Sequence, residues 1–111
     1  VTIAQAARVI TDNKVSGVIV VDTDGRAVGM LSELDCLRSL LSEIYNGQTL
    51  GGDSVVDVMT TPVTDAAPDD DIISVAESML SNKQRRRPVV NQGSLVGQIT
   101  CRQLLGALLD Y

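Results

Sequence analysis

The feature that most constrains this sequence is an internal repeat. A shift of 69 residues superimposes Ile3 on Ile72. After a deletion of one residue in the second copy, a shift of 68 superimposes GMLSELDCL (residues 29–37) on GQITCRQLL (residues 97–105). One copy, of roughly forty to fifty residues, is too small to bury a core well by itself. The repeat therefore predicts two similar units that share their core.

Each copy predicts the order helix, strand, turn, strand, helix. The first helix of each copy carries apolar residues at the spacing of a core-facing stripe. These residues are Ile3, Ala6, Ala7 and Ile10 in the first copy and Ile72, Val75, Ala76 and Met79 in the second. Thr2 and Asp71 stand at the matching N-cap positions.

Short β-branched runs at residues 18–22 and 88–91 predict the first strand of each copy. The return strands are expected at residues 27–31 and 95–99. The turns between them end in Gly25 and Gly93, which can adopt the positive φ that a hairpin turn requires. The closing helices carry a set of leucines, which comprises Leu34, Leu37 and Leu41 in the first copy and Leu104, Leu105 and Leu108 in the second.

The segment between the copies has a Gly-rich loop, a helical turn at residues 55–59 and a predicted strand at residues 62–64. We therefore divide the chain into a first repeat (1–45), a connecting loop (46–54) and a second repeat (55–111).

Composition excludes several classes of function. Aromatic residues make up 2% of the chain and its net charge is −5, which argues against a nucleic-acid partner. No apolar run is long enough for a membrane helix, and no signal-peptide pattern follows Val1. Cys36 and Cys101 indicate reduced thiols of a cytoplasmic protein. Because the chain has no His, it lacks Ser-His and Cys-His catalytic pairs, and a zinc site would need more ligands.

From about residue 2 to residue 110 the sequence resembles a tandem pair of CBS domains (cystathionine β-synthase domains), known as a Bateman module. The resemblance is carried by GVIVVDTDGRAVGMLSELD in the first copy and by DVMTTPVTDAAPDDDIISVAESMLSNK and RPVVNQGSLVGQIT in the second. It implies an α+β fold of two β-α-β-β-α repeats that pack sheet to sheet as a pseudo-two-fold pair. The first copy has no counterpart of VVDVMTTPVT, so we expect its N-terminal strand to lie outside this sequence.

The resemblance also implies a regulatory module and not a catalyst. Members of this family sense adenine nucleotides or related adenosyl ligands in clefts between the two copies. We expect AMP, ADP, ATP or a related compound as a regulatory ligand, with no cofactor required and no metal site. A homodimer is expected, together with an effector enzyme or transporter that responds to the ligand.

Ser32 and Asp35 are the central pair of the expected binding site. In the resembled family the Asp of a Ser/Thr-x-x-Asp motif holds the ribose, and the hydroxyl can donate to a phosphate. Ser32 and Asp35 also suit an N-cap and an acidic first turn, so a purely structural role stays open. Carried over by position, the nucleotide-binding residues are Met30, Ser32, Asp35, Ser16, Thr60, Val63, Thr64, Arg85, Arg86 and Pro88.

The run Arg85-Arg86-Arg87 is either a solvated surface or an anion clamp beside the expected phosphate. Strand geometry requires Arg86 to point away from its two neighbours. Arg87 replaces a residue that is Val18 in the first copy. It is therefore expected to snorkel to the surface, or to contact the ligand or a dimer partner.

A second cleft would use Val15, Val18, Ile19, Thr100 and Gln103. Gln103 stands where the first copy has Asp35, and it lacks the charge that strengthens hydroxyl contacts. We therefore expect a weak or empty second site, with Gln103 an ordinary polar residue of its helix. The run Asp69-Asp70-Asp71 is interpreted as helix capping and not as a metal site.

The leading hypothesis is therefore a cytoplasmic adenine-nucleotide sensor that transmits ligand binding to a fused domain or a partner. The alternative is a ligand-free scaffold of the same fold that serves dimerisation or interaction. An enzyme is disfavoured because the sequence shows no paired catalytic residues.

Overall fold

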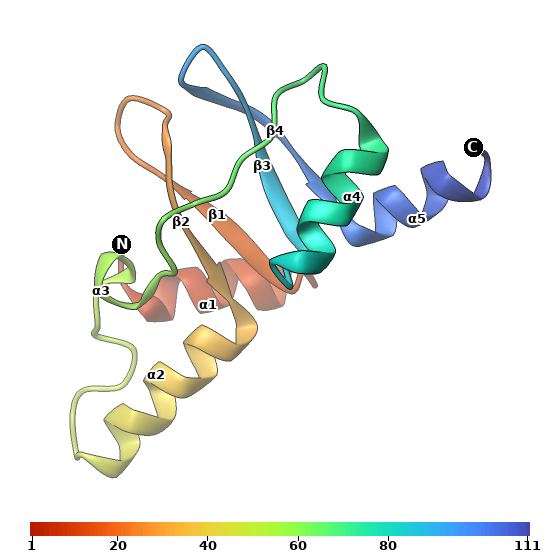
Figure 1. Cartoon of the computed structure of the whole chain (residues 1–111). Helices are drawn as coiled ribbons and strands as arrows, with labels where there is room; N and C mark the ends of the chain where they lie inside the picture. Colours follow the sequence, from red (N-terminus) through yellow and green to blue (C-terminus); the bar gives the residue numbers. More distant parts are fainter. The chain divides into compact units, whose positions relative to one another are not determined.

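The computed structural model describes residues 1–111, in which each repeat forms a strand hairpin flanked by helices (Figure 1). The first repeat contains α1 (Ile3–Asp12), β1 (Gly17–Val21), β2 (Ala27–Ser32) and α2 (Glu33–Tyr45). The connecting segment contains the short helix α3 (Val55–Val58), close to the predicted helical turn.

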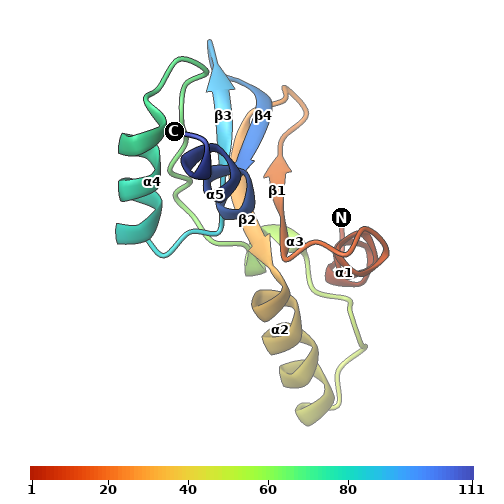
Figure 2. The same cartoon turned by 90° about the vertical axis from the view of Figure 1, so that its right-hand side faces the viewer.

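The second repeat contains α4 (Ile72–Ser81), β3 (Arg86–Asn91), β4 (Ser94–Thr100) and α5 (Cys101–Leu109) (Figure 2). β1 pairs with β2 and β3 pairs with β4, so the chain has two small two-stranded sheets. The α+β fold class is confirmed.

Caps and turns follow the prediction from the repeat. The Thr2 side chain accepts a hydrogen bond from the Gln5 N–H, and the Asp71 side chain accepts one from the Ser74 N–H. Gly25 and Gly93 have φ angles of 81° and 82°, so each hairpin uses its glycine in the left-handed region.

The chain divides into two compact units. The first comprises Val1–Val20 and Val28–Pro62, and the second comprises Val21–Ala27 and Val63–Tyr111. The tip of the first hairpin thus belongs to the second unit, where the Gly25 C=O accepts a hydrogen bond from the Leu95 N–H at 2.9 Å.

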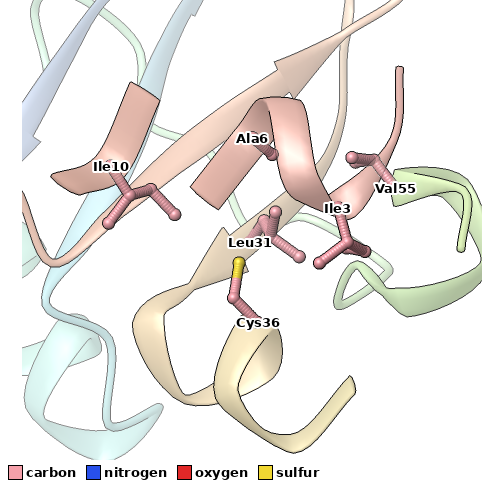
Figure 3. Close-up of a cluster of buried hydrophobic side chains, with 6 residues drawn as sticks. All are labelled: Ile3, Ala6, Ile10, Leu31, Cys36 and Val55. Carbon is pink, nitrogen blue, oxygen red and sulfur yellow. The ribbon is translucent and has the colours of Figure 1, made fainter. Parts of the chain in front are cut away.

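The core of the first unit lies between α1, β2, α2 and α3 (Figure 3). Its buried side chains are Ile3, Ala6, Ile10, Leu31, Cys36 and Val55. The core of the second unit is formed by Ala66, Val75, Met79 and Leu104. The predicted helical stripes therefore supply half of the buried side chains of each core.

The predicted strand at residues 62–64 is wrong. The backbone makes isolated bridges on either side of this range: Thr60 pairs antiparallel with Met30, and Ala66 pairs parallel with Val89. Pro62 has no N–H to donate to a ladder, and the segment between the bridges forms no continuous strand.

A buried carboxylate fixes the Gly-rich loop against α2. Glu43 is almost fully buried, and its two oxygens accept hydrogen bonds from the backbone N–H groups of Gly51 (2.9 Å) and Asp53 (3.3 Å). The Ser39 hydroxyl donates to the Asp53 carboxylate at 3.1 Å. These bonds satisfy the polar groups that the loop would otherwise bury without partners.

Candidate functional site

The junction between β2 and α2 holds the central predicted pair in a reciprocal capping box. The Ser32 Oγ accepts a hydrogen bond from the Asp35 N–H at 3.1 Å, and the Asp35 Oδ2 accepts one from the Ser32 N–H at 2.9 Å. Ser32 and Asp35 therefore cap the N-terminus of α2.

After capping, each of these side chains can still make a further hydrogen bond. The Ser32 hydroxyl still has its proton to donate, and the Asp35 Oδ1 makes only a long contact, 3.6 Å, with Arg38 Nη1. The Asp35 side chain is 15% exposed and that of Arg38 is 76% exposed, so this ion pair is weak. A carboxylate oxygen is thus available to accept hydrogen bonds from hydroxyl groups.

Backbone bonds bring other predicted residues to the same end of β2. Met30 and Thr60 exchange two hydrogen bonds: the Met30 N–H donates to the Thr60 C=O at 3.1 Å, and the Thr60 N–H donates to the Met30 C=O at 2.8 Å. The Ser16 C=O accepts a hydrogen bond from the Glu33 N–H at 2.9 Å, in the first turn of α2. The predicted residues Ser16, Met30, Ser32, Asp35 and Thr60 therefore belong to the first unit.

The cysteine next to Asp35 is not a reactive group. Burial raises the pKa of the Cys36 thiol above its ordinary value of 9.0, and the negative charge of Asp35 raises this pKa further. The thiol therefore stays protonated near neutral pH and packs as an apolar side chain of the core.

The remaining residues of the predicted site belong to the second unit. Arg85 is exposed, and its C=O accepts a hydrogen bond from the Cys101 N–H at 2.9 Å, which repeats the bond between Ser16 and Glu33. The Pro88 C=O accepts a hydrogen bond from the Ala66 N–H at 2.9 Å. Val63 is half-buried and Thr64 is exposed in the segment before Ala66.

The second and third arginines of the run are buried and point in opposite directions. Arg86 is 8% exposed, and its Nη1 donates to the Gln98 side chain at 2.7 Å. Arg87 is 4% exposed and donates to the side chains of Gln84 and Ser78. The expectation of a solvated run therefore fails for Arg86 and Arg87.

Arg87 also does not snorkel to the surface, contrary to one of the expected roles. Its guanidinium is satisfied inside the second unit by neutral oxygens, two bonds going to Gln84 and one to Ser78 of α4. The alternation of Arg86 and Arg87 follows from the strand, as predicted.

The junction between β4 and α5 repeats the capping box with different chemistry. The Thr100 Oγ1 accepts a hydrogen bond from the Gln103 N–H at 3.2 Å, and the Gln103 Oε1 accepts one from the Thr100 N–H at 2.9 Å. Gln103 therefore offers a ligand a neutral amide, with one acceptor site and its donors, whereas Asp35 offers a charged acceptor. The other residues of the doubtful second site, Val15, Val18 and Ile19, are half-buried in the first unit.

Sequence reasoning missed three residues that act on these junctions. Met59 covers Gly29, because a Cβ added to Gly29 would collide with the Met59 sulfur. Arg38 lies three residues after Asp35, a helical spacing that could have revealed the contact. Gln98 binds Arg86 from the neighbouring strand, which only the strand register shows.

No group of three or more His, Cys, Asp or Glu side chains is arranged to hold a metal ion. In the acidic run, Asp70 accepts a hydrogen bond from the Ala67 N–H, and Asp71 caps α4. All helices are too short or too polar to cross a bilayer.

Comparison with known proteins gives similar sequences and structures. A 17.7 kDa protein of Acidianus ambivalens is 30% identical over 99% of this chain and 64% of its own length. A protein of Methanocaldococcus jannaschii is 30% identical over 96% of this chain and 36% of its own. This chain thus spans less than two thirds of both relatives.

A solved structure similar to this chain is the crystal structure of CBSX2 in complex with AMP. It has a TM-score of 0.84 and 28% identity, and the match covers 98% of this chain and 82% of that one. The family model of the CBS domain matches residues 1–42 and again residues 55–110. The repeat that organises the sequence is thus a repeat of this domain, and the chain belongs to the CBS-domain family.

Proposed function

We propose that this chain is a regulatory module that binds an adenine nucleotide or a related adenosyl ligand through the junction of β2 and α2. The observation that carries the proposal is the spare acceptor of Asp35 beside the spare hydroxyl proton of Ser32. The similar CBSX2 chain binds AMP, which supports an adenosyl ligand.

Each group has a role that suits its chemistry. The Asp35 Oδ1 accepts hydrogen bonds from the ribose hydroxyls, and the Ser32 hydroxyl donates to a phosphate at the N-terminus of α2. The adenine ring lies against apolar strand ends. The second junction is the weaker site, because Gln103 lacks the charge that strengthens hydrogen bonds from ribose hydroxyls.

Ligand binding is transmitted to a fused domain or a partner, which responds to the change in the module. The partner is an enzyme or a transporter. The two free cysteines fit a reducing compartment such as the cytoplasm.

Thermal unfolding in the presence of AMP, ADP, ATP, S-adenosylmethionine and NAD tests this function. A ligand at about 100 times its Kd stabilises the folded state by about 2.7 kcal/mol, which raises the midpoint of a chain of this size by at least about 5 °C. The Asp35→Ala variant should lose this rise, and the matched Gln103→Ala variant should keep it. If no nucleotide raises the midpoint, the ligand-free scaffold is the better function.

We also propose that the module is a homodimer. The closing helices α2 and α5 carry exposed apolar residues at helical spacing, and unusually large exposed apolar patches mark interaction surfaces. These residues are Leu34, Leu37, Leu41 and Ile44 in α2 and Leu105, Leu108 and Leu109 in α5.

Sedimentation at several concentrations tests the dimer. Leu37→Glu and Leu41→Glu together should give a monomer, because two charges would have to be buried without partners. Leu80→Glu, at an exposed position of α4, is the matched control and should stay dimeric. A wild-type chain that sediments as a monomer at all concentrations would contradict the dimer.

A further inference from the structure

The second unit contains a buried cation that has no carboxylate partner. Arg87 is 4% exposed, and its guanidinium forms no ion pair within the chain. Its hydrogen bonds go to two neutral groups, the side-chain carbonyl of Gln84 and the hydroxyl of Ser78. We call Ser78, Gln84 and Arg87 the Arg87 cluster. Burial of a charge without an opposite charge is unfavourable, so a cation kept in this state indicates a role beyond folding.

The first repeat builds the same place from apolar residues. The shift of 69 residues that relates the repeats superimposes the Arg87 cluster on Val9, Val15 and Val18. Of these, Val15 and Val18 pack against the hydrophobic core of their unit. The fold therefore does not require polar groups at these three positions, and their replacements in the second repeat form one hydrogen-bonded set.

The hydrogen bonds of the Arg87 cluster leave donors without acceptors. Arg87 uses its Nε and Nη2 atoms, so both protons of Nη1 remain available. The Ser78 oxygen accepts hydrogen bonds from Arg87 and, at 3.3 Å, from the Asn82 side chain, but no hydrogen bond of the chain uses the proton of this hydroxyl. No fully buried side-chain nitrogen or oxygen in this structure lacks a hydrogen-bond partner, so Nη1 reaches the protein surface.

We infer that the Arg87 cluster is a binding site for one small monovalent inorganic anion such as chloride. Arg87 supplies the positive charge and the N–H groups of Nη1. The Ser78 hydroxyl donates its proton beside the guanidinium, because its oxygen lies 2.8 Å from the Arg87 Nη2.

Burial and charge define this occupant. The anion is small because Arg87 is almost fully buried, and a single negative charge matches a single guanidinium. All residues of the cluster belong to the second unit, and none of them is a residue of the nucleotide site proposed above.

Thermal unfolding of the full chain in sodium chloride and in sodium gluconate at equal ionic strength tests this site. Chloride at about 100 times its Kd should raise the midpoint by at least about 5 °C over gluconate, an anion too bulky for a buried guanidinium. The variant Ser78→Val/Gln84→Val/Arg87→Val, which has the residues of the first repeat, should lose this rise, and so should Arg87→Met. Arg102→Val removes an exposed cation of α5, and this matched control should keep the rise.

A wild-type crystal grown in sodium bromide gives a direct readout that needs no variant to fold, because bromide scatters anomalously. An anomalous peak within hydrogen-bond distance of the Arg87 Nη1 is expected. Three results would overturn the inference: equal midpoints in chloride and gluconate, an undiminished rise in both Arg87 variants, or bromide bound only at other places. If chloride has no effect and Arg87→Met changes only the sedimentation of the chain, the acceptor is a carboxylate of a second copy, and the inference fails.

Discussion

The junction at residues 29–35 and the junction at residues 97–103 solve the same folding problem with different residues. Each has a glycine in the strand, a hydroxyl at the N-cap and a reciprocal capping box. In the first the box is closed by Asp35, and in the second by Gln103, with nearly equal distances. The cap therefore does not require a carboxylate, and the charge of Asp35 is free for another use.

The same two junctions differ in how deeply they are covered. Gly29 lies beneath Met59, whereas Gly97 is exposed. Leu31 is 1% exposed, whereas its counterpart Ile99 is only half-buried. Equivalent positions of the repeat are thus expected to respond unequally to the same substitution.

The largest difference is expected from truncation of the equivalent apolar residues. Leu31→Ala removes a fully buried side chain and should lower the free energy of unfolding by about 2–5 kcal/mol. Ile99→Ala should cost less, because solvent already reaches the Ile99 side chain. Urea unfolding of both variants measures the difference, and equal losses would show that the two cores are equally covered.

A smaller difference is expected at the glycines. Gly29→Ala forces Met59 to move and should cost about 1–3 kcal/mol. Gly97→Ala meets no neighbour and should stabilise the chain by up to about 1 kcal/mol. The cost of Gly29→Ala should shrink in a Met59→Ala background, and an undiminished cost would exclude Met59 as its cause.

The two cysteines provide a comparison of reactivity. Burial and the charge of Asp35 raise the pKa of the Cys36 thiol, whereas Cys101 is only half-buried. Alkylation followed by mass spectrometry should modify Cys101 first, and Cys36 only at the rate of unfolding. Faster modification of Cys36 would contradict its place in the core.

The raised pKa of Cys36 also makes the free energy of unfolding depend on pH. The folded state retains the proton of the Cys36 thiol more strongly than the unfolded state does. The protonated thiol therefore contributes its full stabilisation below the unfolded-state pKa near 9.0. The contribution is lost as pH rises through the higher folded pKa. The unfolding midpoint should therefore fall less above pH 9.0 in a Cys36→Ala variant than in the wild type.

Local features were predictable because they depend on a few neighbouring residues. The N-caps at Thr2 and Asp71 and the turns at Gly25 and Gly93 follow from side-chain chemistry and φ preferences. The closeness of Ser32 and Asp35 follows from their spacing in a helix.

Features that depend on distant residues were not predictable. The strand expected at residues 62–64 is absent, because Thr60 and Ala66 pair with strands that are remote in sequence. Arg87 finds its partner Ser78 of α4 only in the folded second unit. The position of Thr60 beside Met30 came from the family resemblance and not from any local pattern.

The most direct test of the central claim is nucleotide binding by an Asp35→Gln variant, which converts the first junction into the second. Titration calorimetry with the nucleotide that most raises the midpoint, together with unfolding without ligand, measures both roles of Asp35. We predict that Asp35→Gln keeps its cap and unfolds near the wild-type midpoint, but binds at least tenfold more weakly. Wild-type affinity in this variant would contradict the assignment of ligand binding to the Asp35 carboxylate.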